Sequence, residues 1–367
     1  ALRPRVGEGK LHYPNDVAID PNAQYAVICE SFENRLQIIA ARDPETQKTG
    51  PPPFPTPGNT SHFGEYLAVD GQLLAISQPE LHQIEIFDMR RETPIHVTSF
   101  GRRGRPFGQF IRISGLEVNE SSREVLICDA AMNRLQRFAL KYDLDGPLRF
   151  SPYISRLLTS LDLTEVVPDT PWPVRPAAIR RGPNGRLYMV DSRNHCVHVF
   201  DSEYSHVRRI GKHGSEPGQF NRPTDVAISA DGKYIHVVDS RNHRVQKLTD
   251  TGEFVAQIGA VGDAPGEMLD PFGVYVGNGY TVYVTDAARH VIQKFDADGR
   301  FVKQWGGLGT EQPQLWKPRG IVMDDRGRLI VSDYGNHRAK TFSADGEWLM
   351  TFGLGRVYTP DNTSTGN

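Results

Sequence analysis

Short hydrophobic runs separated by polar turns follow one another along almost the whole chain. In residues 211–259, four such runs rich in Val, Ile, Leu, Phe and Tyr are divided by Gly, Pro, Asp or Asn. Runs of this length and composition predict β-strands, and the residues between them predict tight antiparallel turns. We therefore expect a unit of four antiparallel strands, named a, b, c and d in chain order.

The unit repeats. Residues 259–306 and 306–353 repeat the pattern of 211–259, and weaker copies precede them. The residue that closes strand b recurs at intervals of 47, 52, 62, 48, 47 and 47 residues, at Glu30, Ser77, Asp129, Asp191, Asp239, Asp286 and Asp333. One small four-stranded sheet cannot bury both of its faces, so the copies must pack face to face around an axis. The pattern predicts an all-β fold, a seven-bladed β-propeller of four-stranded antiparallel blades, or alternatively six blades plus a degenerate sheet.

Two segments interrupt the period. We expect residues 1–353 to form a single propeller domain with insertions at 40–62 and 139–172, followed by a mobile tail at 354–367. The first insertion is rich in proline and predicts an extended surface loop. In the second, hydrophobic residues near helical spacing predict a short helix that caps the propeller. These residues are Ile154, Leu157, Leu158 and Leu161.

The strongest copies read DSRNHRVQKL at 239–248, DSRNHCVHVF at 191–200 and DYGNHRAKTF at 333–342. With the G-x-x-G loop before strand a, this pattern resembles the NHL-repeat family of β-propellers, over residues 6–353. Members of that family usually show six blades. The resemblance implies an interaction module, because some NHL propellers in tripartite-motif regulators bind RNA hairpins on a basic face and others bind proteins.

The aspartates that close strand b have a structural interpretation. An Asp before a tight turn accepts hydrogen bonds from the following backbone N–H groups. We expect this role for Asp129, Asp191, Asp239, Asp286 and Asp333. Because every good copy repeats the set, the turn histidines are interpreted as turn residues rather than metal ligands. These are His195, His243, His290 and His337.

Charge is unevenly divided between the two predicted faces. The b–c and d–a loops share one face and carry basic residues, at Arg102, Arg103, Arg105, Arg193, Lys212, His213, Arg222, Arg241, Arg289, Lys317 and Arg319. The a–b and c–d loops carry mainly acidic residues, such as Asp231, Asp250 and Asp296. We expect a partner to bind the basic face, through Arg193, Arg241, Phe272, Arg289, Trp316, Arg319 and Tyr334. A protein partner is the first hypothesis, and structured RNA on the same face is the second.

A third hypothesis is a hydrolase or lyase with a metal in the channel. A calcium-dependent hydrolase needs several oxygen ligands at the start of the a strands, where only Asp16, Asp225 and Glu65 are acidic. A zinc-dependent lyase of similar repeat needs histidines there, and the chain has Asn15, Ala177, Thr224, Phe272 and Arg319. We therefore expect no catalytic residue, no metal site and no cofactor.

Composition adds three limits. With 42 Lys+Arg against 44 Asp+Glu, the net charge is −2, which argues against a protein that coats nucleic acid or membranes through bulk charge. The chain contains no hydrophobic run long enough to span a membrane. The three cysteines and the absence of a leader favour an intracellular, cytoplasmic location. We expect Cys29 and Cys128 to be buried and Cys196, in a b–c turn, to be more reactive.

Overall fold

The fold is described from a computed structural model of residues 1–367. The described residues are 14–19, 25–30, 35–40, 67–70, 73–78, 82–88, 95–119, 123–140, 156–163, 167, 170–323, 327–336 and 338–352. Within them the chain forms β-sheets and three short 3-10 turns. No helix in the described part is long and hydrophobic enough to cross a membrane.

The described strands form six four-stranded antiparallel sheets and one three-stranded sheet, numbered here in chain order. Sheet one contains β1 (Pro14–Ile19), β2 (Tyr25–Glu30) and β3 (Arg35–Ala40). Sheet two contains β4 (Leu67–Asp70), β5 (Leu73–Gln78), β6 (Gln83–Asp88) and β7 (Ile95–Phe100). Sheet three contains β8 (Ile113–Asn119), β9 (Glu124–Asp129), β10 (Arg134–Ala139) and β11 (Arg156–Asp162).

The remaining four sheets have the same order of strands. Sheet four contains β12 (Pro176–Arg181), β13 (Leu187–Asp191), β14 (Cys196–Phe200) and β15 (His206–Ile210). Sheet five contains β16 (Val226–Ile228), β17 (Tyr234–Asp239), β18 (Arg244–Thr249) and β19 (Phe254–Ile258), with η1 (Ser240–Asn242) between β17 and β18. Sheet six contains β20 (Pro271–Val276), β21 (Val282–Asp286), β22 (Val291–Phe295) and β23 (Phe301–Gly306), with η2 (Asn278–Tyr280). Sheet seven contains β24 (Pro318–Met323), β25 (Leu329–Asp333), β26 (Arg338–Phe342) and β27 (Trp348–Phe352), with η3 (Tyr334–Asn336).

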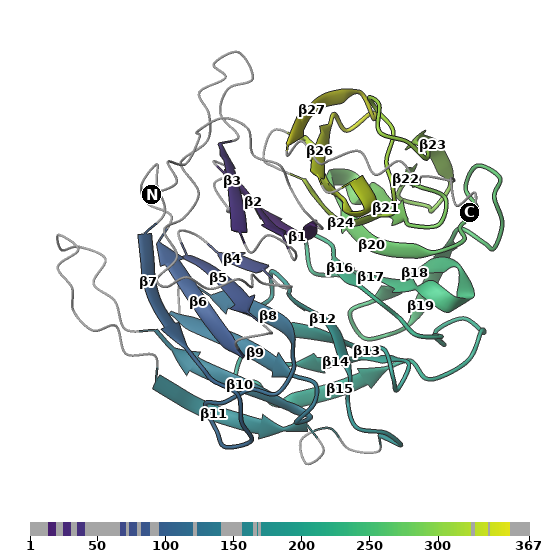
Figure 1. The fold of residues 1–367 in the computed structure, drawn as a ribbon. Helices are drawn as coiled ribbons and strands as arrows, with labels where there is room; N and C mark the ends of the chain where they lie inside the picture. The colour runs from purple at the N-terminus through teal and green to yellow at the C-terminus, as the bar shows by residue number, and fades with distance from the viewer. Residues whose placement is uncertain are drawn as a thin grey trace, which may run out of the picture.

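The sheets are arranged around a common axis as a β-propeller (Figure 1). The first strand of each sheet lies nearest the axis and contacts the first strand of the next sheet: β4 contacts β8, β8 contacts β12, and so on to β24, which contacts β1. Each sheet is an antiparallel meander, because strands that follow one another in the chain pair side by side. The predicted propeller of four-stranded antiparallel blades is therefore confirmed.

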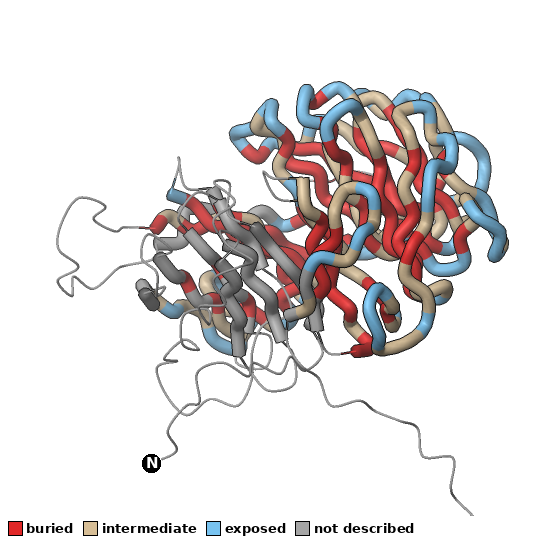
Figure 2. The backbone as a smooth tube through the Cα atoms, turned by 90° about the horizontal axis from the view of Figure 1, so that it is seen from above, coloured by how far each residue is buried: buried red, intermediate tan, exposed pale blue. Residues whose placement is uncertain are grey.

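The hydrophobic core lies between successive sheets. One cluster packs Ile84 and Ile86 of sheet two against Leu116 and Phe138 of sheet three, and similar clusters join sheets three to four, four to five, five to six and six to seven. Middle strands are buried on both faces; every residue of β9 and β13, for example, is buried. Figure 2 shows this pattern as buried strands beneath exposed loops. The interfaces between sheets, rather than one central core, hold the ring together.

One predicted element is wrong. Residues 156–162 form strand β11, which pairs with β10, and not a capping helix. Leucines at the spacing of Leu157, Leu158 and Leu161 suit either a strand or a helix, and β10 needs a partner on its outer side to satisfy its backbone hydrogen bonds. Beyond this strand, the Val167 amide donates a hydrogen bond to the Leu163 carbonyl. Most of the insertion at 40–62 and all of the tail at 354–367 lie outside the described residues.

Candidate functional site at the channel mouth

The aspartates that close strand b bind the backbone of the loop leading into their own sheet. Asp129 accepts hydrogen bonds from the amides of Ile111 and Arg112, at 3.1 and 2.9 Å. Asp286 does the same for Leu269 and Asp270, at 2.8 and 3.1 Å. The side chains of Asp129, Asp191, Asp239, Asp286 and Asp333 are fully buried. Each of them satisfies backbone donors, as the turn interpretation requires.

Side chains from strand c anchor the same loops. In sheet five, Arg244 donates to the carbonyls of Glu216 and Gln219, and Gln246 accepts from the Gly218 amide at 2.8 Å. In sheet three, Arg134 and Gln136 bind the loop at 105–109 in the same way. In sheet seven Lys340 donates to two loop carbonyls. The G-x-x-G loops are therefore fixed to the sheets that they precede.

The turn histidines join neighbouring sheets. The Nδ1 atom of His195 accepts a hydrogen bond from the Arg222 amide at 2.8 Å, and that of His290 accepts one from the Lys317 amide at 3.0 Å. His195, His243 and His290 all have a positive φ, which the turn after strand b requires. These contacts place the b–c turn of one sheet against the d–a loop of the next. Both kinds of loop thus lie on one face of the ring.

A hollow of about 420 Å³ opens at the centre of this face. Its lining includes the starts of the innermost strands at Ser114–Gly115, Ala177–Ala178, Thr224–Asp225, Phe272–Gly273 and Arg319–Gly320, which are the positions that the sequence predicted for the rim. Four arginines line it, Arg112, Arg175, Arg180 and Arg319. Among the lining residues that the structure describes, Asp225 is the only acid and none is a histidine.

The one acid is paired. The Asp225 carboxylate lies 3.2 Å from the Arg180 guanidinium, and its side chain is 13% exposed. Burial raises the pKa of Asp225, and the Arg180 charge acts in the opposite direction. This ion pair offsets the positive charge of Arg180.

Three of the seven predicted partner residues meet in the hollow. The Arg319 guanidinium lies over the Tyr334 ring, 3.7 Å from its centroid, and 5.0 Å from the centroid of Phe272. All three are half-buried and line the hollow. The stacking holds the guanidinium plane in place between two aromatic side chains.

The other four predicted residues lie away from the hollow. Arg289 is engaged in structure, because its guanidinium donates to the carbonyls of Glu267 and Asp263. Trp316 packs against Gly335, and its amide bonds Asp333 at 2.6 Å. Arg193 and Arg241 are exposed farther from the axis, with Arg193 over the Trp172 ring at 5.3 Å.

The face that carries the b–c and d–a loops is less uniformly basic than the sequence predicted. The d–a loops also carry acids that weaken the contrast between faces, at Glu216, Asp263, Glu267, Asp270 and Glu311. The net positive charge is concentrated at the hollow instead. Sequence reasoning missed Arg112 and Arg175, although each immediately precedes the first residue of an inner strand. A basic residue also recurs directly before the proline of the same loop, at Arg175, Arg222 and Lys317.

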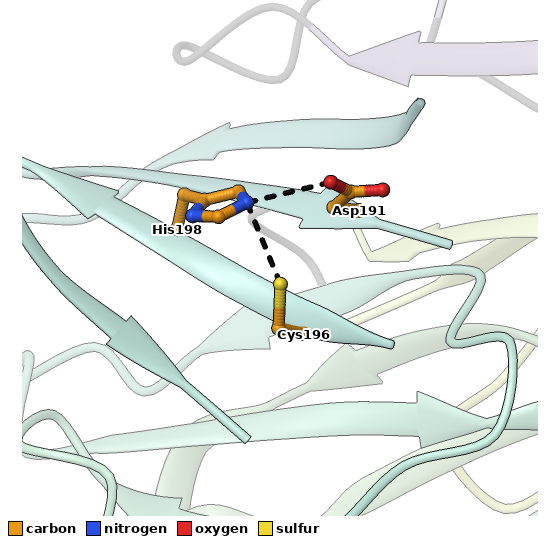
Figure 3. Close-up of side chains that lie close together, drawn as sticks. All are labelled: Asp191, Cys196 and His198. Atoms are coloured by element: carbon orange, nitrogen blue, oxygen red, sulfur yellow. Dashed lines mark hydrogen bonds and ion pairs between the residues drawn. The ribbon is translucent and has the colours of Figure 1, made fainter. Parts of the chain in front are cut away.

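A second group of reactive side chains lies inside sheet four. Asp191, Cys196 and His198 have no exposed surface, and their polar atoms converge (Figure 3). The Nε2 atom of His198 lies 3.4 Å from Cys196 Sγ and 3.4 Å from a carboxylate oxygen of Asp191. Hydrogen bonds from His198 and Asn194 help to hold the pKa of Asp191 below its ordinary value, although burial opposes them.

The expectation of a reactive Cys196 is wrong. The residue begins strand β14 and points into the sheet rather than into the turn. Burial raises the pKa of its thiol to about 12, with the Asp191 charge acting in the same direction. Cys128 is buried as predicted, with its pKa also raised to about 12; the side chain of Cys29 lies outside the described residues.

Known proteins are similar in fold and, locally, in sequence. Residues 181–248 match a family described as a 6-bladed β-propeller of unknown function, and residues 315–339 match the NHL repeat. No curated protein matches the chain significantly in sequence.

Among solved structures, a streptogramin B lyase superposes with a TM-score of 0.64 at 14% identity, over 89% of this chain and 93% of that one. Hydrazine synthase from Kuenenia stuttgartiensis gives 0.66 at 14% identity, over 95% and 100%. The Cps50 (Swd1) β-propeller domain from Myceliophteria thermophila gives 0.63 at 10% identity, over 92% and 99%. At these identities the similarity concerns the fold alone.

The repeat, the ring of antiparallel sheets and the family matches agree. The G-x-x-G loops, the buried turn aspartates and the matched repeat at 315–339 occur in one continuous architecture. The chain is a β-propeller with a match to the NHL repeat at residues 315–339.

Proposed function

We propose that the protein is a non-catalytic interaction module that binds an acidic segment of a partner protein at the channel mouth. The observation that carries this proposal is the hollow on the b–c/d–a face, whose described lining contains four arginines and one acid, Asp225, which is paired. Carboxylates bind the planar guanidinium group through two parallel hydrogen bonds, so such a lining favours an acidic peptide.

The arrangement around Arg319 supports recognition as well as attraction. Phe272 and Tyr334 hold its guanidinium in one orientation, so less side-chain freedom is lost when a carboxylate binds. The exposed Arg112 and Arg175 lie on the same rim and are available to steer an acidic segment towards it. Together these residues provide a stacked anchor and an exposed positive rim.

The test is a charge reversal at the rim. The double variant Arg112→Glu/Arg175→Glu, used as bait with a cell lysate and read by mass spectrometry, should lose the partners that the unchanged protein recovers. Arg300→Glu, an exposed arginine of the opposite face with a side chain 75% exposed, is the matched control and should keep them. Retention of all partners by the double variant would place the binding site elsewhere.

RNA is the alternative outcome of the same experiment. Filter binding of an RNA hairpin is measured at about 50 and 200 mM salt, because phosphate contacts make affinity fall steeply with salt. We expect no tight binding at the lower salt. Strong, salt-dependent binding that the double variant loses would favour RNA over an acidic protein.

We also infer that the ring counts seven blades, with sheet one as an incomplete blade. The inference is supported by the contacts of β1 with β24 on one side and β4 on the other. The family model that matches residues 181–248 describes six blades, one fewer than this inference requires. A crystal structure in which β4 packs directly on β24 would contradict it.

A further inference from the structure

Sheet four departs from its neighbours at the two anchor positions of strand c. In the register of sheets three and five, the buried aspartate is paired with Arg134 or Arg244. In sheet four the residue at that position is Cys196, opposite Asp191. Two residues later, where the neighbours have glutamine, sheet four has His198. Both changes replace hydrogen-bonding side chains with metal-binding ones.

Loop anchoring does not account for these two residues. The loops into sheets three, five, six and seven contain the G-x-x-G sequence and a backbone bridge across the loop. The segment into sheet four, residues 164–175, lacks that sequence. Its described part is held instead by Asn194, which exchanges hydrogen bonds with the Trp172 backbone at 2.8 and 3.1 Å. Cys196 and His198 therefore have no such loop to hold.

The geometry of the three side chains also excludes a catalytic triad. In a triad the thiol and the carboxylate contact different nitrogens of the histidine ring. Here both contact Nε2, each at 3.4 Å, so three donor atoms face one point (Figure 3). With zinc–sulfur bonds of about 2.3 Å and zinc–nitrogen or –oxygen bonds of about 2.0–2.2 Å, a tetrahedral site separates its ligand atoms by about 3.4–3.6 Å. The two separations from Nε2 fit those edges, and all three ligand atoms lie within 4.8 Å of one another.

We propose that Asp191, Cys196 and His198 bind one zinc ion inside sheet four. Binding displaces the thiol proton of Cys196 to solvent and forms a sulfur–zinc bond, while His198 ligates through Nε2 and Asp191 through a carboxylate oxygen. A water molecule completes the four ligands. The thiolate and carboxylate carry two negative charges, which the dication neutralises, so the buried group is neutral overall.

Three protein ligands and a water are the set found in catalytic zinc sites, but burial of all three ligands keeps a substrate away from the ion, so we assign it a structural role. All three ligands have no exposed surface, and they join the end of β13 to the start of β14. Arg209 of β15 lies beside the thiol, where its charge favours the thiolate. The ion would lock the turn between two strands of a sheet that lacks the G-x-x-G loop of sheets three, five, six and seven. This site is independent of the proposed partner surface.

The test uses the full chain purified without a histidine tag. After removal of metals by a chelator, the protein is titrated with cobalt(II) and then with zinc. We expect one equivalent to bind, with a thiolate-to-cobalt charge-transfer band that zinc abolishes. Cys196→Ser should remove the band and weaken zinc binding at least about tenfold. Cys128→Ser, which removes the other fully buried described thiol, should leave both unchanged.

A second measurement does not depend on a variant that folds. Alkylation of Cys196 in the unchanged protein, followed by mass spectrometry, should slow at least about tenfold when zinc is added, whereas alkylation of Cys128 should not. Two results would overturn the proposal: binding of less than a tenth of an equivalent of zinc by the unchanged protein, or equal zinc binding by Cys196→Ser and Cys128→Ser.

Discussion

In sheet five, the aspartate that ends the second strand is surrounded by long polar side chains, whereas in sheet four the matching aspartate lies beside a thiol and an imidazole. Asp239 receives Arg244 at 2.8 Å and Gln246 at 3.2 Å. Asp191 receives His198 at 3.4 Å, next to Cys196. The backbone register is the same in both sheets. Two residues of strand c thus decide whether the buried carboxylate helps to anchor a loop or faces a metal-binding group.

The difference teaches what the repeat holds constant. In both sheets the aspartate accepts hydrogen bonds from the segment entering the sheet, from Arg175 in one and Asn221 in the other. The backbone part of the network is therefore common, and the side-chain part is free to vary where the loop differs. Substitutions of these strand c side chains measure how much of the free energy of unfolding depends on them.

The largest effect is expected from Arg244→Met in sheet five. The substitution keeps the hydrophobic stem but removes the ion pair with Asp239 and the two bonds to the loop carbonyls. Because the buried carboxylate is left without its cation, the free energy of unfolding should fall by about 3–5 kcal/mol. Urea denaturation measures it.

The control is Arg241→Met in the adjacent turn. This side chain is exposed, so its replacement should change the free energy of unfolding by no more than about 0.5 kcal/mol. Equal losses from both variants would show that the buried ion pair of sheet five is not what separates it from sheet four.

A second prediction concerns acid and the buried histidine of sheet five. Burial lowers the pKa of His236 to about 3, and Lys247 acts in the same direction. The unfolded chain, with an ordinary histidine pKa near ~6.5, binds the proton more readily than the native state. Stability from this group is therefore complete above that pH and is lost as the pH falls, by about 1.4 kcal/mol per pH unit.

His236→Phe should flatten this dependence. Urea denaturation of the variant and the unchanged protein is compared at several values between about pH 7 and pH 5. As the pH falls below ~6.5, the variant should gain about 1.4 kcal/mol per pH unit relative to the unchanged protein, because only the unchanged protein loses the contribution of the neutral buried imidazole. Parallel curves for the two proteins would contradict the assigned protonation state.

The sequence predicted the ring more fully than the site. Hydrophobic runs and recurring aspartates place the strands, because the same backbone network is needed in every sheet. The sequence did identify three residues of the hollow. Phe272 and Arg319 lie at the start of inner strands, Tyr334 directly follows strand b, and both kinds of position line the hollow. The sequence alone could not show that Arg289 turns back to its own loop. In sheet six the anchor position of strand c is occupied by Val291 instead of an arginine, and Arg289 binds the loop in its place.

The errors have similar local causes. The pattern at 154–161 suits a strand as well as a helix, and only the free edge of β10 decides between them. Cys196 was interpreted as a turn residue because it follows the histidine, but the left-handed turn ends at His195 and the next residue begins the buried strand. Neither outcome is visible without the pairing of strands.

Gln246→Ala should have an intermediate effect. The change leaves the Gly218 amide without its acceptor, at present 2.8 Å away, and removes one of the two side chains that donate to the Gln219 carbonyl. The expected loss is about 1–3 kcal/mol. Hydrogen exchange should accelerate at residues 211–220 in particular, because their loop is released from sheet five. Unchanged exchange in that loop, with the exposed Glu253→Ala as a reference, would contradict an anchoring role.

The smallest effect is expected at the turn histidines, where sheets four and five differ in the direction of one hydrogen bond. His195 Nδ1 accepts from the Arg222 amide, so the ring must be neutral there, and burial together with His213 lowers its pKa. His243 Nδ1 must donate to the Leu269 carbonyl, at 2.6 Å.

Because asparagine tolerates a positive φ, His195→Asn and His243→Asn isolate these bonds. Each should cost about 1 kcal/mol at neutral pH. The cost of His195→Asn should shrink as the pH falls below ~6.5, since acid already breaks that bond in the unchanged protein, whereas the cost of His243→Asn should persist because a protonated ring still donates. Urea denaturation at two pH values distinguishes them, and the same pH trend in both variants would show that the two turns are equivalent after all.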